Sequence, residues 1–201
     1  MSDTWAWISG WGIQPERFKA AAERALPDAT HQVFAPEPDV IDAVLSSGAS
    51  HFGGYSLGSL LLMRAVDGID RSCTVICLAP IPAFCKEAAM GGLTPRKIVE
   101  SLQLKLERKP EAALKLFYRL YELNDEPTGV LPYSVDSLIW GLDMLATQSA
   151  PQQAFERVHA LISEADSLMD ATTLRGLFKN HSSTARGHDY HDLLPMLATL
   201  Q

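Results

Sequence analysis

The chain reads His51-Phe52-Gly53-Gly54-Tyr55-Ser56-Leu57-Gly58 between an expected strand, 51–55, and an expected helix, 59–67. In the pattern G-x-S-x-G, a serine between a strand and a helix occupies a sharp, strained turn, and its hydroxyl projects from the end of a sheet. The glycines avoid collisions that a Cβ would make with neighbouring backbone. The helix N-terminus directs N–H groups and a positive dipole end at the same place. Ser56 is therefore a candidate nucleophile for a carbonyl carbon, although the five-residue pattern alone is common.

The composition indicates one globular domain. A chain of 201 residues, 47% hydrophobic and 20% charged, can bury a sizeable core. The net charge of -7 argues against a nucleic-acid partner. No apolar run approaches the ~20 residues that span a bilayer, and the N-terminus lacks the basic region of a secretory signal. We therefore expect one domain over 1–201, with no membrane partner and a monomeric state.

The cysteines indicate a reducing environment. Cys73, Cys77 and Cys85 cannot all pair, and the first two lie at an apolar strand. Free thiols in such a setting fit a cytoplasmic location. No Cys pair combines with histidines at zinc spacing, so neither a metal nor another cofactor is expected.

Strand and helix patterns alternate along the chain. The expected strands are 5–9, 31–34, 51–55, 73–78, 158–163 and 182–186, and the helices between them are 15–26, 40–45, 59–67 and 172–178. Continuous apolar strands alternating with helices are typical of an α/β fold with a mostly parallel sheet of about six strands, covered on both faces. In such sheets the chemistry lies at the carboxyl ends of the strands.

The segment between Pro80 and Gln153 breaks this alternation. Apolar residues at helical spacing predict helices over 95–109, 111–123 and 134–146. A stretch of this length without a strand is far longer than an ordinary connection. We therefore expect a helical cap over approximately 81–153, inserted before the strand 158–163.

A nucleophilic serine needs a base that can reach it. His188 follows Gly187 on the loop after the last expected strand and is the favoured candidate. His191, three residues later, competes with it, whereas His181 precedes the strand and would lie at its far end. A solvated loop histidine is the alternative interpretation of His188.

A carboxylate is then needed to orient the imidazole. Asp166 lies on the loop after the strand 158–163, with Glu164 and Asp170 as alternatives. An aspartate at this place could instead cap a helix. The order Ser56, Asp166, His188 is the one expected for an α/β hydrolase.

Two backbone N–H groups would stabilise the oxyanion. One belongs to Leu57, the residue after the nucleophile. The other is expected in the turn Gly10-Trp11-Gly12, where glycines allow close approach, and is assigned to Trp11. A plain tight turn with a core tryptophan is the alternative.

These motifs together resemble the α/β-hydrolase superfamily, and within it the pimeloyl-acyl-carrier-protein methyl ester esterases of biotin synthesis (BioH type). The cap contributes to the resemblance through 95–106 and 137–145. The resemblance implies an α/β-hydrolase fold and a cofactor-free serine carboxylesterase that cleaves the methyl ester of pimeloyl-acyl carrier protein. The chain departs from the family at Ser9, where a histidine is common. It also begins at what would be the third strand of the family's core.

The cap is basic. From Lys86 to Arg119 there are eight Lys and Arg and four Glu, so the segment is net +4 (8 minus 4) in an acidic protein. Such a face can dock an acidic partner, although charge runs are also common on solvated helices. The resemblance implies that the partner is acyl carrier protein, with docking residues Arg96, Lys97, Lys105, Arg108 and Arg119.

An acyl chain would need an apolar channel. Its expected walls are aromatic side chains, which could instead pack the cap on the core: Trp11, Phe84, Phe117, Tyr121 and Trp140, with Leu57 beside them. Two other functions remain open. One is a general short-acyl carboxylesterase or thioesterase without a carrier partner, and the other is a non-catalytic binding protein with a hydrolase fold.

Overall fold

The computed structural model describes residues 3–121, 123 and 129–199. Their centre is a six-stranded sheet in the order β2-β1-β3-β4-β5-β6. All five pairings are parallel. The strands are β1 (Thr4–Ile8), β2 (Thr30–Phe34), β3 (His51–Tyr55), β4 (Thr74–Leu78), β5 (His159–Ser163) and β6 (His181–Thr184).

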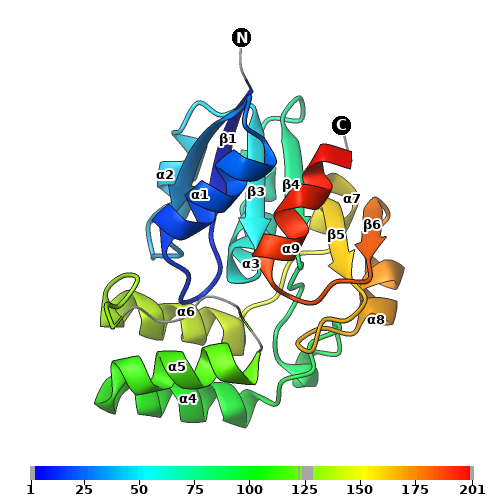
Figure 1. Ribbon diagram of the computed structural model, residues 1–201. Coiled ribbons are helices and arrows are strands. Elements are labelled where there is room, and N and C mark those ends of the chain that lie inside the picture. The colour runs from blue at the N-terminus through cyan, green and yellow to red at the C-terminus, as the bar shows by residue number, and fades with distance from the viewer. Residues whose placement is uncertain (1–2, 122, 124–128, 200–201) are drawn as a thin grey trace.

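Helices cover both faces of the sheet, as Figure 1 shows. One face carries α1 (Pro15–Ala25), α9 (Tyr190–Leu193) and the 3-10 helix η3 (Leu194–Thr199). The other carries α2 (Val40–Leu45), α3 (Leu57–Arg64) and α7 (Ala154–Arg157), while α8 (Ala171–Leu177) lies beside β5. The expected α/β fold with a parallel sheet is confirmed. In the part of the chain that is described, no helix is long and apolar enough to cross a membrane.

The central strands are apolar on both sides because both faces are covered. Residues 5–8 of β1 are all buried. Trp7 lies opposite Gly53 of β3, and its indole ring occupies the space that a side chain at position 53 would need. The small residue in β3 is thus matched to the large one in β1.

Three helices form a separate layer beyond the carboxyl ends of the strands (Figure 1). They are α4 (Arg96–Arg108), α5 (Pro110–Leu120) and α6 (Val135–Thr147), and they follow β4 and the short 3-10 helix η2 (Lys86–Ala88). Each buries one apolar side, for example Val99, Leu102 and Leu106 of α4. This layer occupies the chain position expected for the cap, between β4 and β5.

The bounds of two helices differ most from expectation. The helix expected to start at Ser59 begins two residues earlier, at Leu57, and ends at Arg64 before the 3-10 helix η1 (Val66–Gly68). The Ser56 carbonyl accepts the first hydrogen bonds, from the N–H groups of Ser59 and Leu60. In the cap, α5 starts at Pro110, whose fixed φ suits a first helical position, and ends at Leu120 rather than 123.

Candidate active site

Ser56 occupies the turn between β3 and α3 in a strained backbone conformation. Its φ of 54° and ψ of -118° lie where residues with a side chain are rare. The glycines on either side are required by close packing. A Cβ on Gly54 would lie 2.6 Å from the carbonyl oxygen of Gly58, and a Cβ on Gly58 would overlap the carbonyl of Ile8. The G-x-S-x-G pattern therefore holds the serine at the end of the central strand.

Three predicted residues form one hydrogen-bonded chain. His188 Nε2 lies 2.9 Å from Ser56 Oγ, and His188 Nδ1 lies 2.7 Å from Asp166 Oδ2. The imidazole and carboxylate side chains are almost completely buried, at 3% and 1% exposure. This geometry allows Nε2 to take the serine proton while the carboxylate stabilises the resulting imidazolium.

Neighbouring groups fix the histidine and the aspartate. The Tyr55 hydroxyl donates to the His188 carbonyl oxygen at 3.0 Å. The other carboxylate oxygen of Asp166 accepts a hydrogen bond from the Leu168 N–H at 2.8 Å. Both partners of the serine are thus held by the fold and not only by each other.

The two alternative acids are engaged elsewhere. Glu164 is exposed and pairs with Arg175, whose hydrogen bond lowers the pKa of the Glu164 carboxyl. Asp170 caps α8 by accepting from the Thr173 N–H at 2.8 Å, and the Thr173 hydroxyl lowers the pKa of the Asp170 carboxyl. Asp166 is the acid that the structure places against His188.

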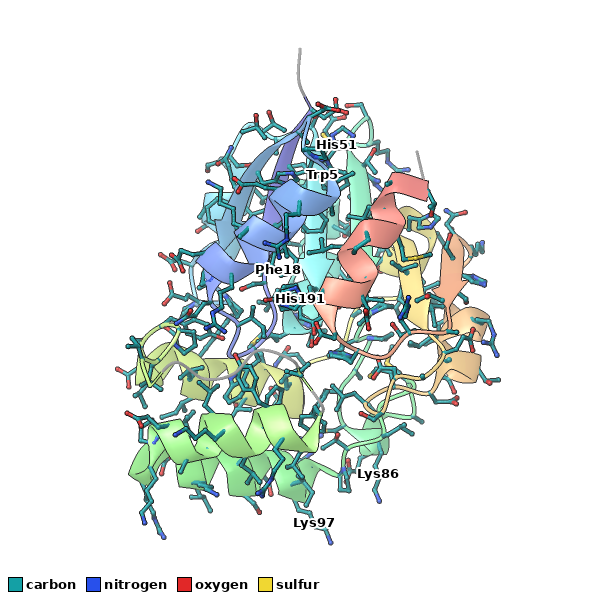
Figure 2. The ribbon with its side chains drawn as sticks, viewed as in Figure 1. Trp5, Phe18, His51, Lys86, Lys97 and His191 are labelled. Atoms are coloured by element: carbon teal, nitrogen blue, oxygen red, sulfur yellow. The ribbon has the colours of Figure 1, made fainter. Side chains whose placement is uncertain are left out.

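The alternative bases also lie elsewhere. His191 is in α9, where its ring packs on Tyr190 with centroids 4.1 Å apart. His181 is the first residue of β6, and its Nδ1 lies 3.0 Å from the Phe178 carbonyl oxygen. Figure 2 labels His191 on the sheet side of the molecule, away from the outer face of the cap.

The turn expected to supply an oxyanion donor lies beside the serine. A Cβ on Gly10 would lie 3.3 Å from Ser56 Cβ. Ile13 N–H donates to the Gly10 carbonyl at 3.2 Å and closes the turn. Within the described residues, neither the Trp11 N–H nor the Leu57 N–H has a hydrogen-bond partner. The turn beside Ser56 and the start of α3 therefore each offer a backbone N–H that could bind an oxyanion.

The cap reaches this place through Gly141 of α6. A Cβ on Gly141 would lie 2.7 Å from the Trp11 ring and 3.1 Å from a Leu57 methyl group. The side chains of Trp11 and Leu57, the two expected oxyanion-hole residues, thus both pack against α6 at Gly141. Gly141 has no distinctive signal in the sequence, because a glycine inside a helix shows no pattern until its neighbour is known.

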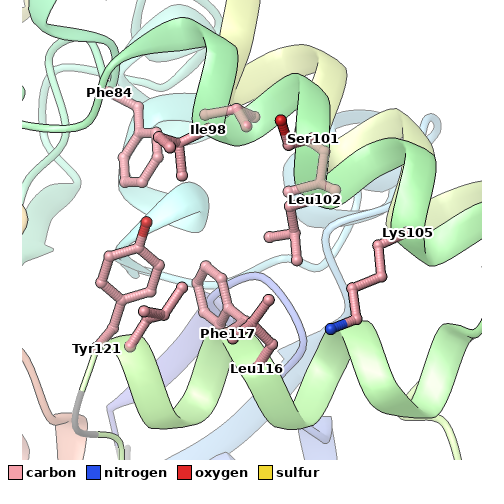
Figure 3. A pocket seen from close by; sticks show the side chains of 11 residues that line it. Phe84, Ile98, Ser101, Leu102, Lys105, Leu116, Phe117 and Tyr121 are labelled. Carbon is pink, nitrogen blue, oxygen red and sulfur yellow. The ribbon is translucent and has the colours of Figure 1, made fainter.

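An apolar cavity of about 300 Å³ lies between α4 and α5 (Figure 3). Three expected channel residues, Phe84, Phe117 and Tyr121, line it. Trp11 is buried against Phe117, with ring centroids 4.5 Å apart, and Trp140 is half-buried; neither is among the lining residues. The remaining lining is Ile98, Val99, Ser101, Leu102, Lys105, Leu116, Leu120 and Leu142.

The five expected docking residues lie on α4 and α5. Lys97, Arg108 and Arg119 are exposed, and Arg96 and Lys105 are half-buried. Figure 2 shows Lys86 and Lys97 projecting from the cap away from the sheet. In the described ranges none of the five forms an ion pair. Their charge is therefore available to a partner.

The described residues offer no metal site. No group of three or more His, Cys, Asp or Glu side chains among them could hold a metal ion. The three cysteines are free.

Comparison with known proteins identifies the fold. No family model matches the chain, and no curated protein is similar to it in sequence. Among solved structures, BioG from Haemophilus influenzae superposes with a TM-score of 0.63 at 13% identity, over 99% of this chain and 94% of that chain. A hydrolase from Oleispira antarctica gives 0.57 at 16% identity, over 99% and 88%. RedJ, a thioesterase of prodiginine biosynthesis in Streptomyces coelicolor, gives 0.56 at 14% identity, over 98% and 89%. The chain has the α/β-hydrolase fold.

Proposed function

We propose that this chain is a serine carboxylesterase that hydrolyses the methyl ester of pimeloyl-acyl carrier protein in the cytoplasm, as a step of biotin biosynthesis. The main support for a hydrolase is the pair of buried hydrogen bonds that links Asp166 to His188 and His188 to Ser56. The BioG superposition supports the hydrolase fold, and the cap described above favours the assignment of the substrate.

The reaction has two halves. Ser56 Oγ attacks the ester carbonyl carbon while His188 Nε2 takes its proton, and the N–H groups of Trp11 and Leu57 bind the oxyanion. The tetrahedral intermediate collapses, His188 protonates the leaving methoxide, and methanol departs. A water molecule then attacks the acyl-enzyme by the same proton route and releases the free carboxylic acid and Ser56.

The cap supplies the features that favour a carrier-borne acyl chain. The cavity is lined mainly by apolar side chains, as an aliphatic chain requires. Lys105 lines this cavity, and together with Arg108 it also lines a second hollow along α4. The cavity therefore borders the surface that carries the expected docking residues. A carrier protein docked on that face would stand beside the cavity that receives its acyl chain.

The thioesterase RedJ favours a second candidate function, a short-acyl carboxylesterase or thioesterase without a carrier partner. The test compares methyl pimeloyl-acyl carrier protein with free methyl, aryl and thioester substrates of the same acyl chain. Preference for the carrier-bound methyl ester, with loss of that activity in Ser56→Ala, supports the proposal. Equal or better turnover of the free esters favours the second function.

Complementation tests the pathway. A biotin-requiring strain that lacks its own esterase should grow with this chain and not with Ser56→Ala. Failure of the active chain to support growth would contradict the assignment to biotin synthesis.

A further inference from the structure

The turn 10–12 is held by the cap through side chains that the reaction above does not use. The Gly12 N–H donates to the Tyr133 hydroxyl at 2.6 Å, and the Gly12 carbonyl accepts from the Tyr118 hydroxyl at 2.5 Å. Tyr118 belongs to α5, and Tyr133 lies two residues before α6. Both polar groups of one glycine are therefore bound by two phenols from different parts of the cap.

A third bond anchors the neighbouring residue. Trp11 Nε1 donates to the Leu138 carbonyl oxygen of α6 at 2.8 Å. Leu138 lies in the first turn of α6, so this hydrogen bond anchors the indole to a helix. Trp11 and Gly12 together carry three hydrogen bonds to the cap, from positions more than one hundred residues later in the chain.

Gly12 needs such restraint. Its φ of 75° lies in the left-handed region that glycine adopts freely, and glycine also samples other conformations at little cost. Rotation at Gly12 would tilt the peptide that joins Trp11 to Gly12 and, through the Trp11 Cα, would shift the Trp11 N–H, which belongs to the next peptide back. Binding both the N–H and the carbonyl of Gly12 fixes the peptide planes on its two sides.

The Tyr133 bond also removes a competing donor. With its N–H engaged by Tyr133, Gly12 offers no free donor, whereas the Trp11 N–H has no protein partner within the described residues. Burial raises the pKa of Tyr133, so its hydroxyl stays neutral over the working pH range. The hydroxyl can therefore accept the bond from Gly12 without placing a negative charge near the oxyanion.

We propose that Tyr118 and Tyr133 are positioning residues that hold the oxyanion turn in its productive conformation, so that the cap takes part in transition-state stabilisation as well as in substrate binding. The inference rests on the proposed function in two respects, the role of Ser56 as nucleophile and that of the Trp11 N–H as an oxyanion donor. It does not depend on pimeloyl-acyl carrier protein as substrate.

The consequence is a specific kinetic pattern. Oxyanion contacts strengthen only in the transition state, so loosening the turn lowers kcat and leaves KM unchanged. Direct loss of an oxyanion donor lowers kcat by about 10²–10³. Indirect loosening through one hydroxyl should lower kcat by roughly tenfold, and removal of both hydroxyls by up to about a hundredfold.

The experiment uses Tyr118→Phe, Tyr133→Phe and the double variant of the full chain, with a small aryl acetate as substrate. Each variant keeps its ring, so packing is preserved. Ser134→Ala is the matched control, because it removes the N-cap of α6 next to Tyr133 and leaves the Gly12 bonds in place. Binding of an aryl trifluoromethyl ketone, which forms an oxyanion on Ser56, is measured alongside.

The expected result is a lower kcat at constant KM in the tyrosine variants, with inhibitor affinity weakened by the same factor, and an unchanged kcat in Ser134→Ala. An unchanged kcat in folded Tyr118→Phe and Tyr133→Phe would overturn the proposal, as would an equal loss in Ser134→Ala or a rise in KM alone. If the double variant does not fold, the single variants decide. Wild-type turnover of the aryl ester without turnover of the carrier-bound ester would contradict the proposed substrate and leave this test intact.

Discussion

Gly58 of α3 packs its Cα directly against the carbonyl of Ile8, so closely that a Cβ at position 58 would overlap the Ile8 oxygen. This contact joins the helix after the candidate nucleophile to the strand that leads to the oxyanion turn. The distance between α3 and β1 therefore depends on the absence of one methyl group.

Gly58→Ala should destabilise the protein by about 3 kcal/mol or more, because the clash is with backbone, which cannot move aside like a flexible side chain. Urea denaturation measures the change in the free energy of unfolding. Gly176→Ala is the matched control, since Gly176 lies in α8 with no atom near its potential Cβ, and alanine there should be neutral or stabilising by up to about 1 kcal/mol. Equal effects at the two positions would contradict this account.

Ser56→Ala, His188→Gln and Asp166→Asn should each lower kcat by about 10³-fold or more, because each removes a member of one hydrogen-bonded chain. A fluorophosphonate probe should label the wild-type chain and not Ser56→Ala. Glu164→Gln is the control, since Glu164 pairs with Arg175 on the surface. Loss of activity in Glu164→Gln equal to that in Asp166→Asn would refute the assignment of the acid.

Reversal of Arg96, Arg108 and Arg119 to Glu should raise KM for the carrier-bound ester by about tenfold and leave the aryl ester unaffected, since these charges lie on the cap surface. The effect should shrink as salt is raised. The control variant carries the same change of charge outside the cap, at the exposed residues Lys19, Arg24 and Arg71. A similar rise in KM in both variants would mean that overall charge, and not the cap, is recognised.

Leu102→Phe should shorten the cavity between α4 and α5, because Leu102 lines it. We expect the KM for long acyl esters to rise several-fold while the acetate ester is unaffected. Chain-length profiling checks this. Leu104→Phe on the same helix is the control, since Leu104 is 56% exposed and does not line this cavity. An unchanged chain-length profile in Leu102→Phe would show that the acyl chain binds elsewhere.

The thiols should differ in reactivity with an aromatic disulfide reagent at pH 8. Burial raises the pKa of Cys77 and of Cys85, so little thiolate forms at either position, whereas Cys73 is only half-buried. We expect Cys73 to react first in the native protein and all three cysteines to react in denaturant. A fast phase that persists in Cys73→Ser would contradict the expected burial.

Much of the fold could be predicted because its signals are local. The apolar runs at β3 and β4 and the helix 40–45 needed only neighbours along the chain, and their bounds agree closely with the structure. The start of α3 was harder, because Leu57 enters the helix through the strained Ser56 turn and not through an ordinary cap.

The site could be predicted as far as the order of strands along the chain indicates which residues lie at the same edge of the sheet. Parallel strands bring their carboxyl ends to one edge, so residues after β3, β5 and β6 were expected to meet, and Ser56, Asp166 and His188 do lie together. The place of Asp166 on the loop after β5 favours it over Asp170 from the sequence, and the structure adds that Asp170 is engaged in capping α8.

The sequence by itself determined the α/β alternation, the strained serine turn and the cap between β4 and β5, because each follows from periodicity and glycine placement over a few residues. Only the tertiary structure decided what the cap touches. The bonds from Tyr118 and Tyr133 to Gly12, and the contact of Gly141 with Trp11 and Leu57, join residues more than eighty positions apart. A buried tyrosine hydroxyl requires a partner, but no local pattern specifies which one, since that depends on how the cap packs over the ends of the strands.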